Sequence, residues 1–135
     1  MDIQASLDQL LQSQQVVVEQ FYELFFERCP EAAAFFNDVD LSRQSLLLTM
    51  GLNVVVTHYR NPSPATAQYL QILGSKHRDL GIPQELFERF CEALLEFLAG
   101  FHGESWSEGL ADQWRQALRD ATKIMLSGYQ TKTRV

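Results

Sequence analysis

The sequence predicts an all-α fold, and three observations support that class. Apolar residues recur every three or four positions along almost the whole chain, which is the period of an amphipathic helix. No segment shows the alternation of apolar and polar residues that is typical of strands, and no internal repeat is present. Prolines, glycines and capping residues divide the chain into helical pieces of unequal length. We therefore expect a single domain over residues 1–135, with one hydrophobic core.

Three helical pieces are predicted before residue 40. The leucines of residues 3–12 share one helical face, so a short amphipathic helix is expected there. Pro30 begins a short turn of helix that reaches Phe36, because proline fits the first position of a helix. Between them, residues 13–29 are predicted to form a helix whose apolar stripe is Val18, Phe21, Tyr22, Phe25 and Cys29.

Two helices with clear start signals follow. Asp40 is a candidate N-cap for a helix that ends at about residue 59. Ser63 is expected to cap the next helix, which begins at a proline and reaches about residue 77. Gly81 marks the end of that helix, since glycine readily adopts the left-handed conformation found there.

The last two helices are the longest apolar segments. A strongly amphipathic helix is predicted over 83–101, and a final helix over about 106–130. Ser105 and Glu108 have the spacing of a capping box for that final helix. Residues 130–135 are expected to be a frayed polar tail.

Composition and charge exclude several classes of function. The net charge is −6 and no basic run is present, which argues against binding nucleic acid or anionic membranes. No apolar run approaches the roughly 20 residues of a membrane span, and the acidic N-terminus lacks the apolar region expected of a signal peptide. Cys29 and Cys91 each lie in an apolar helical pattern, so both are predicted to be buried thiols in a reducing cytoplasm.

Two polar residues are candidates for a binding site. His77 lies at the end of one helix, just before a glycine turn, and a neutral imidazole there could bind a metal. The alternative is a solvated side chain that interacts with the helix dipole. Gln44 lies on an otherwise apolar helical face, where an amide without partners would cost about 1–3 kcal/mol. His58 and His102 have no comparable position, and both are expected at the surface.

Several segments resemble a known family. Over residues 16–128 the chain resembles a single-domain bacterial globin, close to the haem domain of flavohaemoglobins. The matching segments are Phe21–Phe26, Pro30, Phe35-Phe36, Asp40-Leu41, Gln44, Leu48, Leu73–Ile82, Leu94-Leu95 and Trp114. Their order, with His77 placed 33 residues after Gln44, is the specific part of the match. A four-helix bundle would satisfy the same periodicity, but the unequal helix lengths favour a globin fold with helices A, B, C, E, F, G and H around a haem pocket.

The resemblance implies a haem site. His77 would be the proximal ligand of the iron, and Tyr22 and Gln44 would donate hydrogen bonds on the distal side. A shift of one residue would place Arg43 at the position of Gln44, and Phe35 is the rival of Phe36 for packing on the haem. The haem would be haem b, held non-covalently, because no Cys-x-x-Cys-His motif is present. The other implied haem contacts are Phe36, Leu48, Leu73, Ile82, Phe87 and Phe90.

The chain departs from flavohaemoglobins in two respects. Their proximal histidine is supported by a tyrosine and a glutamate, whereas the matching positions here are Phe87 and Tyr129. A less charged histidine environment would favour reversible O2 binding over O–O cleavage. The chain also ends at residue 135, so no flavin or nicotinamide domain is expected.

The resemblance therefore implies reversible binding of O2, NO or CO by a monomer or weak homodimer. NO dioxygenation is a further implied activity, and it would need an external reductase as electron donor. The alternative function is that of a gas or redox sensor or a stress-regulatory module that acts through a protein partner. A regulator that binds no haem should have lost the set of His77, Phe36 and Tyr22, which this chain keeps.

Overall fold

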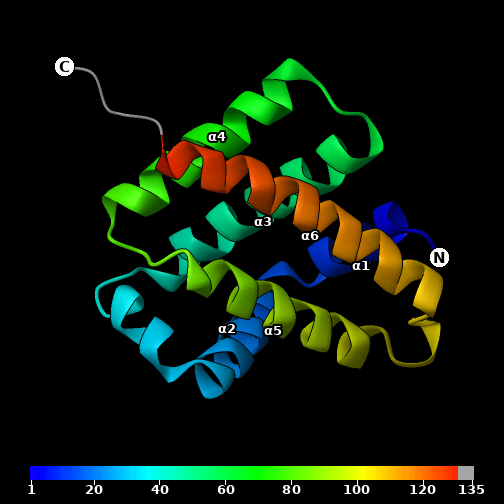
Figure 1. Cartoon of the computed structure of the whole chain (residues 1–135). Helices are drawn as coiled ribbons and strands as arrows, with labels where there is room; N and C mark the ends of the chain where they lie inside the picture. Colours follow the sequence, from blue (N-terminus) through cyan, green and yellow to red (C-terminus); the bar gives the residue numbers. More distant parts are fainter. Residues whose placement is uncertain (131–135) are drawn as a thin grey trace.

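The computed structural model describes residues 1–130, and all regular secondary structure in that range is helical (Figure 1). The predicted all-α class is confirmed. The elements are α1 (Ile3–Gln12), α2 (Gln14–Arg28), the 3-10 helix η1 (Pro30–Phe36), α3 (Leu41–Arg60), α4 (Pro64–Asp79), α5 (Glu85–His102), the 3-10 turn η2 (Gly103–Ser105) and α6 (Glu108–Tyr129). The predicted tail falls mostly on residues 131–135, which lie outside the described range.

Most of the predicted helix starts are confirmed, and one is wrong. The Asp40 side chain accepts from the Ser42 backbone N–H, and Ser63 caps α4 as part of a capping box with Thr66. The predicted capping box at Ser105 does not form, because that residue lies in η2. Ser107 caps α6 instead, with its hydroxyl oxygen accepting from the Leu110 backbone N–H.

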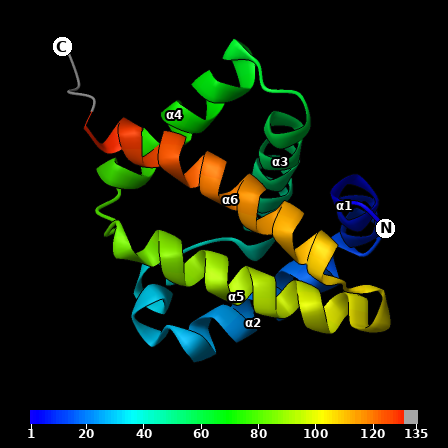
Figure 2. The same ribbon diagram turned by 45° about the vertical axis from the view of Figure 1, so that its right-hand side comes forward.

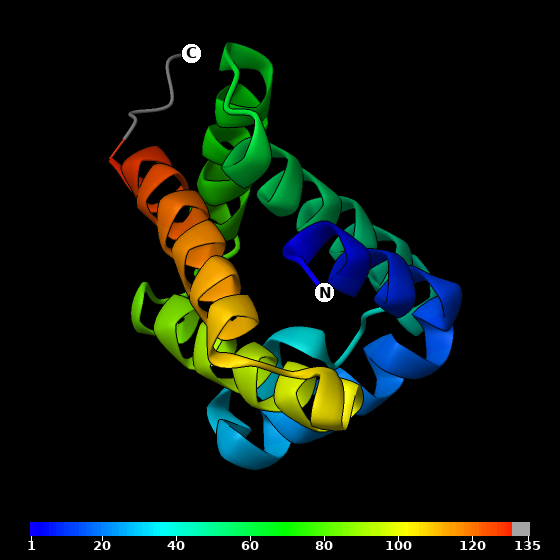
Figure 3. The same ribbon diagram turned by 90° about the vertical axis from the view of Figure 1, so that its right-hand side faces the viewer.

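The helices pack in crossed pairs around one core. Figures 1 and 2 show α4 lying against α6 and α2 crossing α5, and both pairs make many contacts. Trp114 and Phe21 are among the largest side chains that are fully buried between these pairs. Figure 3 shows α1 at the end of the molecule where α6 begins. Among residues 1–130, the structure contains no helix that combines the length and the apolar character needed to cross a membrane.

Two glycines allow α4 and α6 to approach closely. A Cβ atom on Gly74 would lie 1.9 Å from the carbonyl oxygen of Met125, and one on Gly128 would lie 2.4 Å from that of Gln71. Both distances are shorter than any tolerated contact, so a larger residue at either site would push the helices apart. Because α4 also carries His77, this close contact fixes the position of that histidine relative to the core.

A buried polar network connects α1 to the ends of α5 and α6. The Trp114 indole N–H donates to Ser6 Oγ at 3.0 Å, and Ser6 Oγ lies 2.6 Å from Nε2 of His102 in a second hydrogen bond. His102 is buried, so the prediction that it lies at the surface is wrong. His58 is half-buried rather than exposed, with Nδ1 2.7 Å from Oγ1 of Thr66.

The two cysteines are free thiols. Cys29 is fully buried as predicted, while Cys91 is only half-buried on α5. Burial raises the pKa of each thiol, so both stay protonated near neutral pH.

Candidate functional site

His77 lies in the last turn of α4 and is half-buried. Its Nδ1 lies 2.7 Å from the backbone carbonyl oxygen of Leu73, one helical turn earlier. A carbonyl oxygen can only accept, so Nδ1 carries the ring hydrogen and donates it. The Nε2 lone pair is then unprotonated, and no hydrogen bond to it is formed within residues 1–130. This tautomer is the one that a metal ligand requires.

Aromatic packing holds the imidazole in place. The Phe87 ring on α5 lies 5.5 Å from the His77 ring, measured between centroids, and the Tyr129 ring meets Phe87 edge-on at 5.7 Å. The Tyr129 hydroxyl donates to the Ile82 carbonyl at 2.6 Å, which ties the end of α6 to the turn after α4. In that turn Gly81 has a φ of +80°, in the left-handed region that favours glycine. The last turn of α4 is thus anchored from both sides.

Tyr22 and Gln44 meet although they are 22 residues apart in the sequence. The Gln44 Nε2 amide donates to the Tyr22 hydroxyl oxygen at 2.8 Å, which joins α2 to the first turns of α3. Arg43, the alternative for the Gln44 position, is exposed. The contact explains how an amide is accommodated on an apolar face.

The Tyr22 phenol is a neutral donor. Burial raises its pKa to about 12, so the hydroxyl stays protonated at all physiological pH values. Its oxygen accepts from Gln44, but its hydrogen meets no acceptor among the described residues. Since buried polar groups normally have partners, this hydrogen is available to an additional ligand.

An aromatic cluster surrounds the phenol. The rings of Phe36 and Phe26 lie 5.0 Å and 5.7 Å from the Tyr22 ring, and 5.2 Å from each other. Phe36 packs against the core, whereas its rival Phe35 is 38% exposed. Sequence reasoning missed Phe26, although its spacing of four residues from Tyr22 places both on one helical face.

The remaining expected haem contacts lie at the margin of the core. Phe87 is buried, and the other five are half-buried side chains that pack against the core, namely Phe36, Leu48, Leu73, Ile82 and Phe90. In addition, α3 leaves Leu41 and Leu47 about half exposed, three residues before and after Gln44. Apolar side chains from α3, α4 and α5 thus remain partly uncovered around a free imidazole nitrogen and a free phenol hydrogen. This combination of residues fits haem, which is a flat apolar group that needs one axial donor.

His77 belongs to one cluster of side chains, and the Tyr22–Gln44 pair belongs to another. Neither hydrogen bonds nor ring contacts join His77 directly to Tyr22 or Gln44 in the described part of the chain. They are connected through α5, because Phe90 packs edge-on against Phe21 at 5.1 Å, and Phe21 lies 5.2 Å from Tyr22. Helix α5 therefore supports both groups, with Phe87 near one and Phe90 near the other.

Comparison with known proteins supports this arrangement. The family model named Globin matches residues 19–125. A curated relative, the flavohemoprotein of Rhizobium meliloti (strain 1021), is 24% identical over 125 residues, which is 91% of this chain. The chain spans only 31% of the length of that relative.

A solved structure shares the fold. It is a Pseudomonas aeruginosa PAO1 protein described as structurally highly homologous to a human hemoglobin. The two chains are 26% identical and superpose with a TM-score of 0.74, covering 92% of this chain and 98% of the other. Since the family model covers most of the chain and the helices follow the same arrangement, this protein belongs to the globin family.

Proposed function

We propose that this chain is a single globin domain that binds one haem b non-covalently and uses it to bind O2, NO or CO reversibly. His77 Nε2 would hold the haem iron, and Tyr22 and Gln44 would donate hydrogen bonds to the bound gas. Phe36, Leu48, Leu73, Ile82, Phe87 and Phe90 provide the apolar contacts. The haem iron supplies the binding position for the gas, and an external reductase keeps it ferrous.

The hydrogen bonding of His77 carries this proposal. Donation from Nδ1 to the Leu73 carbonyl leaves Nε2 as the only ring nitrogen with a lone pair, and it faces no protein partner within residues 1–130. A solvated surface histidine would not need this fixed tautomer. The half-buried position beside Phe87 also limits its rotation.

The partner of Nδ1 favours reversible ligand binding over peroxidase-like chemistry. A carboxylate partner would give the imidazole anionic character and promote O–O cleavage. Here the partner is a neutral carbonyl, and the Tyr129 hydroxyl is occupied with Ile82. The proximal side therefore provides little additional electron density.

The distal residues suit a ligand that carries partial negative charge. The Tyr22 hydroxyl can donate its hydrogen while it continues to accept from Gln44, so the amide fixes the direction of the phenol. A hydrogen bond to a charged acceptor contributes about 1.5–3 kcal/mol, which is enough to slow the release of such a ligand substantially.

Spectra of the purified full chain in its ferric, ferrous and CO-bound forms test the proposal. We expect haem titration to saturate near one haem per chain, with a Soret band that shifts on CO binding. In the variant His77→Ala this haem binding should be weakened. His58→Ala is the matched control for that variant, because His58 is also half-buried but is already bonded to Thr66. Wild-type protein that shows no Soret band after incubation with haem would contradict the proposal.

A further inference from the structure

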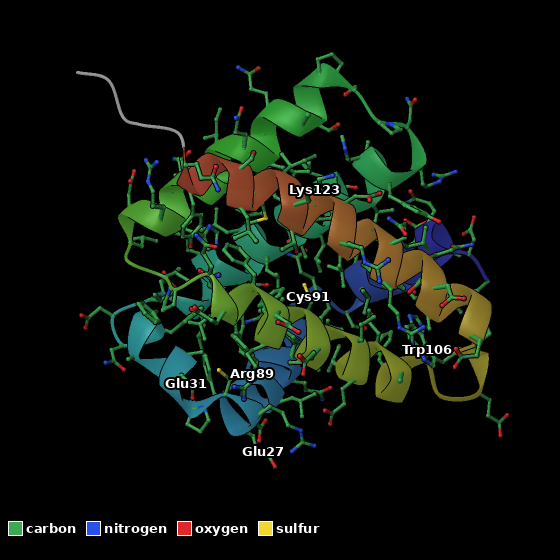
Figure 4. All side chains as sticks on the ribbon, in the orientation of Figure 1. Glu27, Glu31, Arg89, Cys91, Trp106 and Lys123 are labelled. Carbon is green, nitrogen blue, oxygen red and sulfur yellow. The ribbon has the colours of Figure 1, made fainter. Side chains whose placement is uncertain are left out.

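A groove of about 710 Å³ lies between α5 and α6, on a part of the surface that the proposed haem site does not use apart from Phe87. The two helices lie side by side in Figures 1 and 2, and Figure 4 shows Cys91 between them. Half-buried or buried side chains form its apolar floor, among them Cys91, Leu95, Leu118 and Leu126. Cys91 Sγ lies 3.7 Å from Thr122 Oγ1, which places these two residues level with each other near the middle of the groove.

The two edges of the groove carry opposite charges. On α5, Glu88 and Glu92 are exposed one turn apart and form an acidic edge. On α6, Arg115, Arg119 and Lys123 are exposed at the same four-residue spacing and form a basic edge. Within residues 1–130, neither glutamate is ion-paired and neither is Lys123, whereas Arg115 is paired with Asp112 and Glu108.

This charge pattern is complementary to itself. A twofold axis parallel to the groove would turn a second copy over, so that its acidic edge lies above the basic edge of the first copy, and the reverse. A twofold axis across the groove would place like charges against each other. The separation of charge into two edges therefore permits one orientation of a face-to-face pair and opposes the other.

We propose that the α5–α6 groove is the interface of a symmetric homodimer whose twofold axis runs parallel to the groove. The apolar floors meet around Cys91 and Thr122, and Glu88 and Glu92 face Arg119 and Lys123 of the second copy. Such local complementarity is needed because the chain has a net charge of −6, so two copies repel each other overall. This proposal does not depend on haem binding.

The proposed orientation of the two copies is tested by reversing the charge of one edge of the groove at a time. The variant Glu88→Lys/Glu92→Lys gives the groove two basic edges, and Arg119→Glu/Lys123→Glu gives it two acidic edges. Each variant alone should lose the dimer, with a dissociation constant raised at least about 100-fold by like charges that face each other. An equimolar mixture of the two should form a heterodimer, and the chain with all four substitutions should recover the homodimer.

Sedimentation of the full chain over a range of concentrations measures these outcomes, with the helical circular dichroism signal as a check on folding. The matched control is Glu19→Lys/Glu23→Lys, which changes two exposed glutamates at the same spacing on α2 by the same charge. It should leave the dimer unchanged. A wild-type chain that is monomeric at about 1 mM, the weak end of specific association, would overturn the proposal. The proposal would also be overturned if both double variants still formed homodimers, or if the equimolar mixture of the two variants did not associate.

Discussion

His77 and His102 occupy similar positions in their helices but have opposite surroundings. Each lies in the last turn of a helix, and each uses one ring nitrogen for a short hydrogen bond. The second nitrogen of His77 lies on a half-buried ring beside partly uncovered apolar side chains. The second nitrogen of His102, Nδ1, is enclosed by protein and has no partner within the described range.

The difference shows that a free ring nitrogen is not enough to make a ligand site. The His77 ring is half-buried, whereas Nδ1 of His102 is enclosed by protein where the end of α5 meets α1. The His102 ring stacks with Trp106, with centroids 6.2 Å apart, and meets Phe101 edge-on. We therefore propose a ligand role for His77 and a structural role for His102. The following predictions test that division.

The largest expected effect is the loss of haem from His77→Ala. Substitutions in the surroundings of a metal ligand already weaken metal binding about 10–100-fold, and removal of the ligand itself should exceed that range. Haem affinity is measured by titration with Soret absorbance. His102→Ala should keep one haem per chain, and a normal ligand spectrum in His77→Ala would show that the axial donor is another residue.

Ser6→Ala should break the hydrogen bonds around His102 and lower the stability of the chain, while haem binding stays unchanged. The substitution removes the acceptor of the Trp114 N–H and the partner of His102 Nε2, both in the interior. Each buried group without a partner costs about 1–3 kcal/mol, so the loss of partners for two groups should lower the free energy of unfolding by about 2–6 kcal/mol. Urea denaturation measures it. A loss below about 0.5 kcal/mol would mean that the network contributes little.

Tyr22→Phe should speed O2 release while the ring still fills its space. Loss of a hydrogen bond worth about 1.5–3 kcal/mol corresponds to roughly a 10–150-fold higher dissociation rate. Stopped-flow measurement of O2 release tests this, with Tyr69→Phe on α4 as the matched control. CO carries less negative charge on its outer atom, so its release should change much less.

Gln44→Leu sharpens the same comparison. It removes the amide that orients the phenol but leaves the phenol itself, so its effect on O2 release should be smaller than that of Tyr22→Phe. Equal changes for O2 and CO in either variant would indicate a packing role and contradict the distal assignment.

Tyr129→Phe should loosen the turn that follows His77. The Ile82 carbonyl loses its donor, and the expected loss of stability is about 0.5–1.5 kcal/mol, the usual value of one hydrogen bond. Because the Phe87 ring still meets the new phenylalanine ring, the haem spectrum should stay the same. A large change in the spectrum would show that Tyr129 acts directly on the proximal side.

Because His102 is buried, the free energy of unfolding should fall as the pH is lowered. Burial lowers its pKa below the ordinary value of about 6.5 for histidine, so the unfolded chain binds a proton more readily than the folded chain. Stability is then fully present above about pH 6.5 and falls as the pH is lowered toward the pKa of the folded state. His102→Gln, which stays neutral, should flatten this dependence in urea denaturation between pH 7 and 5. An unchanged slope would mean that His102 titrates normally.

The sequence alone determined the order of the helices and most of their ends. These depend on local signals, such as the side-chain caps at Asp40 and Ser63 and the left-handed turn at Gly81, which need no contact from elsewhere in the chain. The residue types of the site, an imidazole at a helix end and an amide on an apolar stripe, were also visible in the sequence. Where two caps competed, as at Ser105 and Ser107, local pattern did not choose between them.

Only the tertiary structure decided which polar groups meet. The contact between Tyr22 and Gln44 depends on the crossing of α2 and α3, and the burial of His102 depends on Ser6, 96 residues earlier. The close approach of Gly74 and Gly128 is equally invisible in the sequence, because each glycine alone looks like an unfavourable helix residue. Local periodicity reports which face of a helix is apolar, but not which helix covers it, and that choice buried His102 and left His77 half-buried.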